Sequence, residues 1–335
     1  MAKDRPTLLA VDGTALAFRA FFAIRGLTDE LGRPSGALYG YLASLLRAIE
    51  ELPHDHVVVA WDRPEPTFRV EIDPEYKANR EELDEDLALQ FPWLREATEL
   101  LGIRSMDRVG FEADDILASL AAKGSERGWE VELYSSDKDL AQVVAPGVWQ
   151  VPPPKQGQPM VKLGPAEIEE KYGLPPTRMA EWQALVGDST DNIKGMPGVG
   201  AKRATTLLGK YPSLEELLDR GPEEEKGKLA ENLGAHRGRP VQLAHVQDQR
   251  LTLLRGDVAQ HAGRAQVIVD DHVDVQVAVD VGEDRAAAGL VDLGQGPAVA
   301  RLVLAGEGGQ QHLLELSATQ AAVDLVRLGV GVLLA

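Results

Sequence analysis

The N-terminal part of the chain alternates short apolar runs of β type with segments of helical periodicity. This alternation is typical of an α/β fold whose mostly parallel central sheet is flanked by helices. We expect strands at 7–11, 57–61 and 130–134, and helices at 37–52, 92–101 and 111–127. Ligands of such sheets bind beyond the carboxyl ends of the strands, and Asp12, Asp62 and Asp137 fall at those ends.

The middle of the chain has a different character. After a connection rich in proline and glycine at 152–159, helical patterns dominate as far as residue 235, at 165–172, 179–186, 201–209 and 213–218. We therefore expect a catalytic α/β domain over 1–178 and a small helical subdomain over 179–235. The charged stretch 69–86 is too polar to belong to the core of either.

The last hundred residues, 236–335, are atypical. They contain no Lys, Asn, Phe, Tyr, Trp or Met, and nearly all belong to the set whose codons can begin with G or C. Our hypothesis is a frameshift near His236 in a GC-rich gene. The competing interpretation is a genuine half-buried strand, because valines recur at every second position over much of 267–281. Sequencing the gene at that point would decide between the two.

Composition excludes several classes of protein. The absence of cysteine rules out disulfides, thiolate nucleophiles and cysteine-ligated zinc, which leaves hard cations such as Mg²⁺ or Mn²⁺ held by carboxylates or histidines. No apolar run is long enough for a membrane span and no secretory leader follows Met1, so we expect a cytoplasmic protein with no membrane partner. The net charge of −18 argues against nucleic-acid binding, unless bound cations invert the field around an acidic site.

Nine acidic side chains have spacings that suggest a metal cluster. They are Asp12, Asp62, Glu112, Asp114, Asp115, Asp137, Asp139, Asp188 and Asp191. Residues three apart, such as Glu112 with Asp115 or Asp188 with Asp191, can share a helix face, and the two aspartates at 137 and 139 can point the same way. Like charges this close need cations to stay ionised. We expect two Mg²⁺ sites, with Mn²⁺ as a substitute, and phosphodiester hydrolysis.

Each acidic residue, taken singly, also has a purely structural interpretation. Any one acid could be a helix cap or a solvated charge, and Asp12 before Gly13 could be a turn residue. Two enzyme classes are disfavoured: the first strand ends without the glycine-rich turn of a dinucleotide-binding fold, and the only histidines before residue 236 that could serve a Ser–His–Asp hydrolase are His54 and His56.

The acids lie in a series of longer motifs. These are Leu9–Gly13, Phe18–Ala20, Trp61-Asp62, Thr67–Arg69, Glu75–Arg80, Gly110–Asp115, Ser136–Leu140, Gly187–Asn192 and Gly195–Ala204. Their order and spacing resemble the 5′-nuclease domain of bacterial DNA polymerase I, within the flap endonuclease family, over about residues 5–235. The resemblance implies a PIN-like 5′-nuclease fold with a helical arch at about 69–92 and a helix-three-turn-helix subdomain.

The resemblance also implies roles for the acids. Asp12, Asp62, Glu112, Asp114 and Asp115 would hold one ion and its waters, and Asp137, Asp139, Asp188 and Asp191 would hold the second. All nine positions of the family pattern are filled. Catalytic roles fall to Asp12, Asp115, Lys77 and Arg80.

Two segments are expected to face DNA. In Tyr76–Arg80, which resembles the start of the arch, an aromatic ring beside two cations can stack on a base and neutralise a phosphate. Arg19 is likewise a phosphate contact by resemblance. The turn at 195–203 opens a helix, where backbone N–H groups can approach phosphate; its expected contacts are Gly195, Gly198, Gly200, Lys202 and Arg203, with K⁺ on loop carbonyls by resemblance.

The expected function is therefore a monomeric 5′-3′ exonuclease and flap endonuclease for branched or 5′-ended duplex DNA, including RNA-primed DNA, in replication and repair. No polymerase portion follows in this chain, so no polymerisation is predicted. Two alternatives remain open. One is a related metal-dependent RNA nuclease, and the other is a non-catalytic DNA-structure-binding module or a defective fragment of a DNA polymerase I gene.

Overall fold

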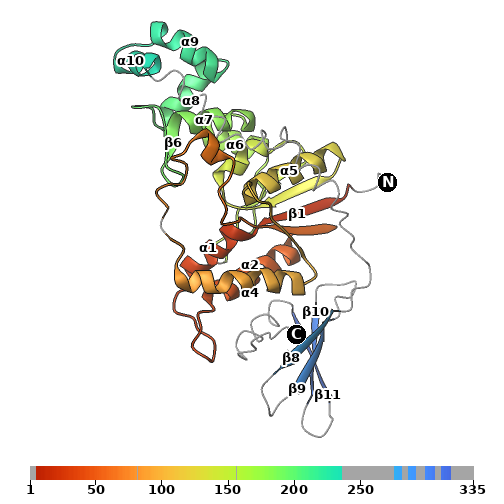
Figure 1. Ribbon diagram of the computed structural model, residues 1–335. Helices are drawn as coiled ribbons and strands as arrows, with labels where there is room; N and C mark the ends of the chain where they lie inside the picture. The colour runs from red at the N-terminus through yellow and green to blue at the C-terminus, as the bar shows by residue number, and fades with distance from the viewer. Residues whose placement is uncertain are drawn as a thin grey trace. The chain divides into compact units, whose positions relative to one another are not determined.

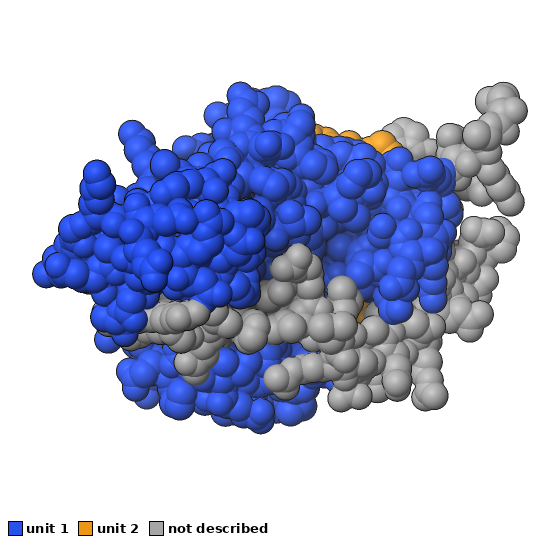
Figure 2. Space-filling model, turned by 90° about the horizontal axis from the view of Figure 1, so that it is seen from above, with its two compact units in different colours: residues 1–12, 60–82, 107–265 blue, residues 13–59, 83–106, 266–335 orange. Residues whose placement is uncertain are grey.

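A computed structural model describes residues 5–80, 82–155 and 157–235, together with the tail strands β8 (Val275–Asp280), β9 (Ala286–Val291), β10 (Val299–Ala305) and β11 (Gln311–Ser317) (Figure 1). The chain divides into two compact units, coloured in Figure 2. Unit 1 comprises Met1–Asp12, Ala60–Glu82 and Asp107–Ala265, and it contains all nine acids. Unit 2 comprises Gly13–Val59, Leu83–Met106 and Gln266–Ala335.

The central sheet has five strands in the order β3-β2-β1-β4-β5. The strands are β1 (Thr7–Asp12), β2 (His56–Ala60), β3 (Arg104–Met106), β4 (Glu130–Tyr134) and β5 (Val148–Gln150). β1 pairs with β4 and β4 with β5 in parallel, which confirms the α/β fold. Leu9, Ala10 and Val11 are fully buried, as expected for a parallel strand covered on both faces.

Helices of unit 1 carry much of the site. They are α3 (Arg69–Ile72), α5 (Ala113–Glu126), α6 (Pro165–Tyr172) and α7 (Met179–Val186), with 3-10 turns η1 (Lys138–Val143) and η2 (Pro176–Arg178). In α5 the apolar side chains Ile116, Leu117 and Leu120 are buried. The helix is therefore fixed by its packing, and its N-terminus is held in one place.

Unit 2 is built on α1 (Gly13–Ala23), α2 (Gly36–Glu51) and α4 (Glu85–Leu100). Phe21, Ala37 and Leu87 form a small core from the three helices. The Tyr41 hydroxyl and the Thr98 hydroxyl, both buried, lie 2.6 Å apart and join α2 to α4.

The charged stretch 69–86 differs from our expectation. Helix α4 begins at Glu85 rather than at residue 92, because acidic residues are favoured in a first turn and the Asp84 carboxylate caps the N–H of Asp86. Arg69 and Tyr76 are only 1% and 6% exposed, so the prediction that this stretch lies wholly outside the core is wrong. Both side chains are buried against acids that satisfy their polar groups.

The helical subdomain consists of α7, a short β6–β7 hairpin (Gly187–Asp188 and Ile193–Lys194), and then α8 (Ala201–Lys210), α9 (Leu214–Glu224) and α10 (Lys228–Ala235). Its core includes Leu185, Leu207, Leu217 and Leu233, and Tyr76 packs into the same cluster. The expected helical character of 179–235 is confirmed, apart from the hairpin.

Gly195 lies where two backbone segments almost touch. A Cβ at this position would come 2.3 Å from the carbonyl carbon of Val186, and the backbone cannot move aside cheaply. We expect Gly195→Ala to lower the free energy of unfolding by about 3 kcal/mol in urea denaturation. The control is Gly209→Ala in α8, where a Cβ meets open space and should stabilise the helix slightly. Equal effects of the two substitutions would contradict the close approach.

In the tail, β8 pairs with β9 and β10 with β11, both antiparallel. β8 coincides with part of the alternating valine run, as the strand interpretation predicts; the rest of that run lies outside the described residues. The frameshift near His236, itself outside the described residues, stays a hypothesis.

Candidate metal and nuclease site

The nine acids lie at the ends of strands and at the starts of helices. Asp12 ends β1 and Asp62 follows β2, while Glu112, Asp114 and Asp115 open α5. Asp137 and Asp139 lie at the start of η1 after β4, Asp188 lies in β6, and Asp191 lies in the turn between β6 and β7. The prediction that Asp12, Asp62 and Asp137 fall at the carboxyl ends of strands is confirmed.

Hydrogen bonds link these chain ends to one another. The Ser135 hydroxyl donates to Asp12 Oδ2 at 3.0 Å and accepts from the backbone N–H of Asp137 at 3.1 Å. Asp62 Oδ1 accepts from the backbone N–H of Ala113 at 2.7 Å, at the first turn of α5. Asp12, Asp62 and Asp137 are thus held in place by hydrogen bonds between the ends of these strands and the start of α5.

Arg69 is the buried partner of the α5 acids. Its Nη1 and Nη2 donate to the two Asp115 oxygens at 2.8 and 2.7 Å, and Nη1 lies 3.8 Å from Glu112 Oε2. Asp115 is fully buried, and its Oδ2 also accepts from the backbone N–H of Glu112 at 2.8 Å. Sequence reasoning missed this role of Arg69, because an arginine in a charged stretch suggests a surface residue. The available signal was its place in the Thr67–Arg69 motif.

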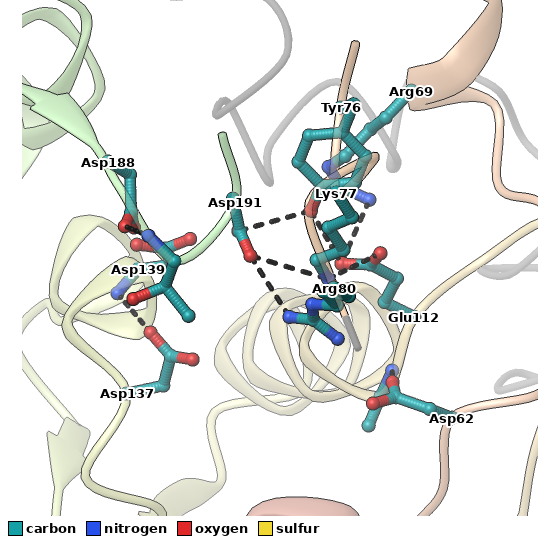
Figure 3. A network of polar contacts seen from close by, with 12 residues as sticks. Asp62, Arg69, Tyr76, Lys77, Arg80, Glu112, Asp137, Asp139, Asp188 and Asp191 are labelled. Carbon is teal, nitrogen blue, oxygen red and sulfur yellow. Dashed lines mark hydrogen bonds and ion pairs between the residues drawn. The ribbon is translucent and has the colours of Figure 1, made fainter. Parts of the chain in front are cut away.

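Lys77 and Arg80 lie between Glu112 and Asp191 (Figure 3). Lys77 Nζ is 2.7 Å from Glu112 Oε1 and 3.9 Å from Asp191 Oδ1. Arg80 Nη2 donates to Asp191 Oδ1 at 3.0 Å. Lys77 therefore bridges an acid of the expected first site and an acid of the expected second site, and Arg80 adds a second cation on the latter.

Tyr76 supports the same two acids. Its hydroxyl donates toward Glu112 Oε2 at 3.0 Å and Asp191 Oδ2 at 3.3 Å, and its ring is buried. The expectation that this ring stacks on a base does not agree with the structure, because the ring is enclosed by the core of the helical subdomain. Its polar tip instead satisfies the carboxylates.

The second group of acids has its own partners. Asp137 Oδ1 accepts from the backbone N–H of Asp139 at 2.9 Å, and the buried Gln183 amide donates to Asp139 Oδ1. Lys138 Nζ lies 2.7 Å from Asp188 Oδ2. The prediction that Asp188 and Asp191 share a helix face is wrong: Asp188 ends β6 and Asp191 lies in the hairpin turn that follows, where Asp188 Oδ1 accepts from the backbone N–H of Thr190 at 2.8 Å.

The carboxyl groups differ in how well they are compensated. Burial, followed by the charges of Asp137 and Asp191, raises the pKa of Asp139 to about 8. Burial also raises the pKa of Asp62, and burial with the charge of Asp115 raises that of Asp114. For Asp188 burial opposes ionisation, but the hydrogen bonds from Lys138 and from the backbone N–H of Thr190, together with the Lys138 charge, outweigh it and lower the pKa. Negative charge is therefore under-compensated at several acids of the cluster.

This donor set suits hard divalent cations. It offers only oxygen ligands, several of them buried, and the Lys77 ammonium bridging two carboxylates marks a position that tolerates positive charge. Among the residues described, no three acidic or histidine side chains converge closely enough to enclose one ion. In this arrangement Arg69, Lys77, Arg80 and Lys138 form ion pairs with the carboxylates.

The remaining predicted residues lie elsewhere. Arg19 is exposed on α1, in unit 2. The glycine-rich turn opens α8 as expected, with Gly200 just before the helix and Gly198 in the left-handed region at φ 77°. Lys202 and Arg203 are exposed in the first turn of α8, and Arg203 Nη1 donates to the Gly198 carbonyl at 2.8 Å.

Within the described part of the chain, no helix combines the length and apolarity that crossing a bilayer requires.

Comparison with known proteins identifies relatives of this architecture. The chain is 40% identical over 250 residues to the thermostable DNA polymerase I of Thermus thermophilus, a match that covers 73% of this chain and 28% of that protein. It is 35% identical over 248 residues to DNA polymerase I of Mycobacterium tuberculosis, with 73% and 27% covered. The chain thus spans less than a third of the length of these relatives.

Solved structures share the fold. The T5 D15 protein co-crystallised with metal ions matches with a TM-score of 0.63 and 24% identity, covering 77% of this chain and 97% of that one. The D15 flap endonuclease of bacteriophage T5, in a pseudo-enzyme-product complex with DNA and metal ions, matches with a TM-score of 0.65 and 23% identity over the same shares.

Two family profiles match consecutive parts of the chain. Residues 7–173 match the N-terminal resolvase-like domain of 5′-3′ exonucleases, and residues 174–266 match their C-terminal SAM fold. The second match continues past residue 236, where we place the start of the tail. Together with the five-stranded sheet and the helical subdomain that follows it, these matches show that the chain belongs to the 5′-3′ exonuclease family.

Proposed function

We propose that the chain is a structure-specific 5′-3′ exonuclease and flap endonuclease that hydrolyses DNA phosphodiesters near 5′ ends and flaps. The observation that carries this proposal is the meeting of Lys77 and Arg80 with Glu112 and Asp191, which brings cationic side chains and two groups of acids to one place. Acids of this kind suit two divalent ions, and the two cations suit a phosphate.

The acids divide between two ions, Mg²⁺ in the first instance and Mn²⁺ as a substitute. Asp12, Asp62, Glu112 and Asp114 would hold the first, with Asp115 in its outer shell because Arg69 already engages both Asp115 oxygens. Asp137, Asp139, Asp188 and Asp191 would hold the second. Bound divalent ions supply an activated water and stabilise the leaving oxygen of the phosphodiester.

The chain's own side chains position the substrate. Lys77 and Arg80 neutralise the scissile phosphate once they release their carboxylates, and Arg19 is a further phosphate contact. The turn at 195–203 contacts the duplex backbone through the backbone N–H groups of Gly195, Gly198 and Gly200. The side chains of Lys202 and Arg203 add positive charge there. A K⁺ ion bound by the carbonyls of the turn would strengthen this contact. Such contacts read the shape of DNA rather than its bases. We propose a monomeric intracellular enzyme of replication and repair, acting on branched, 5′-ended and RNA-primed DNA.

A panel of 5′-labelled substrates of one sequence tests the substrate class. In Mg²⁺ we expect a 5′ flap to be cut faster than single-stranded DNA, and single-stranded RNA to be cut slowest. A preference for single-stranded RNA would assign the chain to the RNA nucleases instead.

A second candidate function is DNA-structure binding without cleavage. It is favoured by the lack, among the described residues, of any three converging acids. Tight binding of the flap with no product in either Mg²⁺ or Mn²⁺ would support this candidate and reject the nuclease.

The proposed DNA contact at the start of α8 can be tested separately through DNA affinity. Because Lys202 is exposed in the first turn of α8, Lys202→Ala should weaken binding equally for all sequences and reduce the slope of log K against log salt by about 1. Fluorescence anisotropy over a salt series measures both quantities. Lys123→Ala, which removes a lysine paired with Glu126 on α5, is the control and should leave the slope unchanged. An equal change of the salt slope in both variants would contradict the assignment of the turn at 195–203 as a DNA contact.

A further inference from the structure

The segment 75–80 is docked on the hairpin turn 188–192 by contacts that are independent of the acids. The Asn79 side-chain amide donates to the Ser189 carbonyl at 3.0 Å. In the reverse direction, the Asn192 side-chain amide donates to the Glu75 carbonyl at 2.8 Å. Between them the backbone N–H of Lys77 donates to the Asp191 carbonyl at 2.9 Å. Each segment thus contributes one asparagine whose side-chain amide donates to a backbone carbonyl of the other segment.

The same contact contains unusual backbone. Lys77 has a φ of 55° and Asn192 a φ of 57°, and these are the non-glycine residues with positive φ in the described part of the chain. Lysine gains little from this left-handed conformation, which persists only where surrounding contacts enforce it. The docking of 75–80 on the turn therefore fixes the backbone from which the Lys77 side chain projects.

We propose that Asn79 and Asn192 form a clasp that positions Lys77 and Arg80 over the acids, an inference that rests on the proposed function. In the structure Lys77 and Arg80 are also tied to the site by ion pairs with Glu112 and Asp191. Those ion pairs are given up when the two side chains turn to a phosphate. The amide hydrogen bonds of the clasp are neutral and end on backbone carbonyls, so they persist through that change.

Neither asparagine takes part in the chemistry. Their amides donate to Ser189 and Glu75 carbonyls, and the contact lies toward solvent rather than among the carboxylates. They are positioning residues, and their loss should leave the acids in place while it loosens 75–80.

The first arm of the test is limited trypsin digestion of the full chain in EDTA, with cleavage after Lys77 and Arg80 quantified by mass spectrometry. Asn79→Ala removes one hydrogen bond, and Asn192→Gly removes the other while it still permits positive φ. Each should raise cleavage at the two sites about tenfold with little change in melting temperature. Asn232→Ala removes a bond of the same type, to the Pro197 carbonyl, and should leave cleavage at those sites unchanged.

The second arm separates positioning from a general structural effect. On a 5′ flap each variant should lower kcat about tenfold and leave KM nearly unchanged. In a Lys77→Ala/Arg80→Ala background the asparagine substitutions should cause no further loss, since there is nothing left to position.

Unchanged digestion, or a full additional loss in the double-alanine background, would overturn the clasp. The two proposals fail separately. A wild-type chain that cuts no flap rejects the proposed nuclease, whereas the digestion arm then still decides whether the clasp exists.

Discussion

Replacing Asp139 with asparagine is expected to remove cleavage of flap DNA and, at the same time, to make the metal-free protein more stable. Asp139 is buried, is close to Asp137 and Asp191, and its side chain accepts a hydrogen bond from the neutral Gln183 amide. Asparagine keeps the shape and the Oδ1 acceptor but lacks the charge. We expect cleavage to fall about a hundredfold or more, because an anionic ligand of the proposed second ion is lost.

The stability gain should depend on pH. Burial and the neighbouring acids raise the pKa of Asp139 to about 8 in the folded chain, well above its ordinary value of 3.8. The stability that this group contributes is present below pH 4 and is lost as pH rises toward about 8. In EDTA, Asp139→Asn should therefore match the wild type at about pH 4 and exceed it by about 1 kcal/mol or more at pH 8.

Urea denaturation in EDTA across this pH range measures the difference. Glu170→Gln, at an exposed acid on α6 outside the site, is the control and should change neither stability nor cleavage. A variant that is less stable than the wild type at pH 8 would show that the Asp139 charge is already compensated by the protein.

The second large effect concerns the Arg69–Asp115 pair. Arg69 is 1% exposed and Asp115 is fully buried, with two hydrogen bonds between them. Arg69→Met should lower the free energy of unfolding by about 3–5 kcal/mol, because it leaves buried carboxylates without a counter-charge. Arg69→Met/Asp115→Asn should recover part of this loss.

Arg63 provides the comparison for this prediction. It also pairs with two acids, Glu65 and Asp107, but its side chain is 33% exposed. Arg63→Met should therefore destabilise the chain far less than Arg69→Met in the same denaturation experiment. Equal losses for the two arginines would contradict the structural role that we assign to Arg69.

The sequence predicted those parts of the fold that have a strong local pattern. The strands β1, β2 and β4 and the helices α2, α5, α6 and α7 lie within two residues of their expected bounds, because apolar spacing and glycine or proline boundaries define them locally. β3 and β5 have three residues each, which is too short for any alternation to register. The early start of α4 depended on capping by Asp84, inside a run of charges that suggested solvent.

The sequence predicted which residues belong to the candidate site, but not how they are arranged in space. Motif order located the acids, and strand ends explained Asp12, Asp62 and Asp137. No local pattern could show that Asp188 and Asp191 belong to a hairpin, since three-residue spacing fits a helix equally well. The burial of Arg69 and Tyr76 depends on acids 36 or more positions away, a relation that periodicity cannot reveal.

The central claim is that the acidic cluster hydrolyses DNA at 5′ flaps with divalent ions. The most direct measurement is single-turnover cleavage of a 5′-labelled flap oligonucleotide by the full chain, in Mg²⁺ and in excess EDTA. We predict cleavage near the junction in Mg²⁺ and none in EDTA, with activity restored when Mg²⁺ is returned in excess. Cleavage that continues at the same rate in EDTA would contradict the claim.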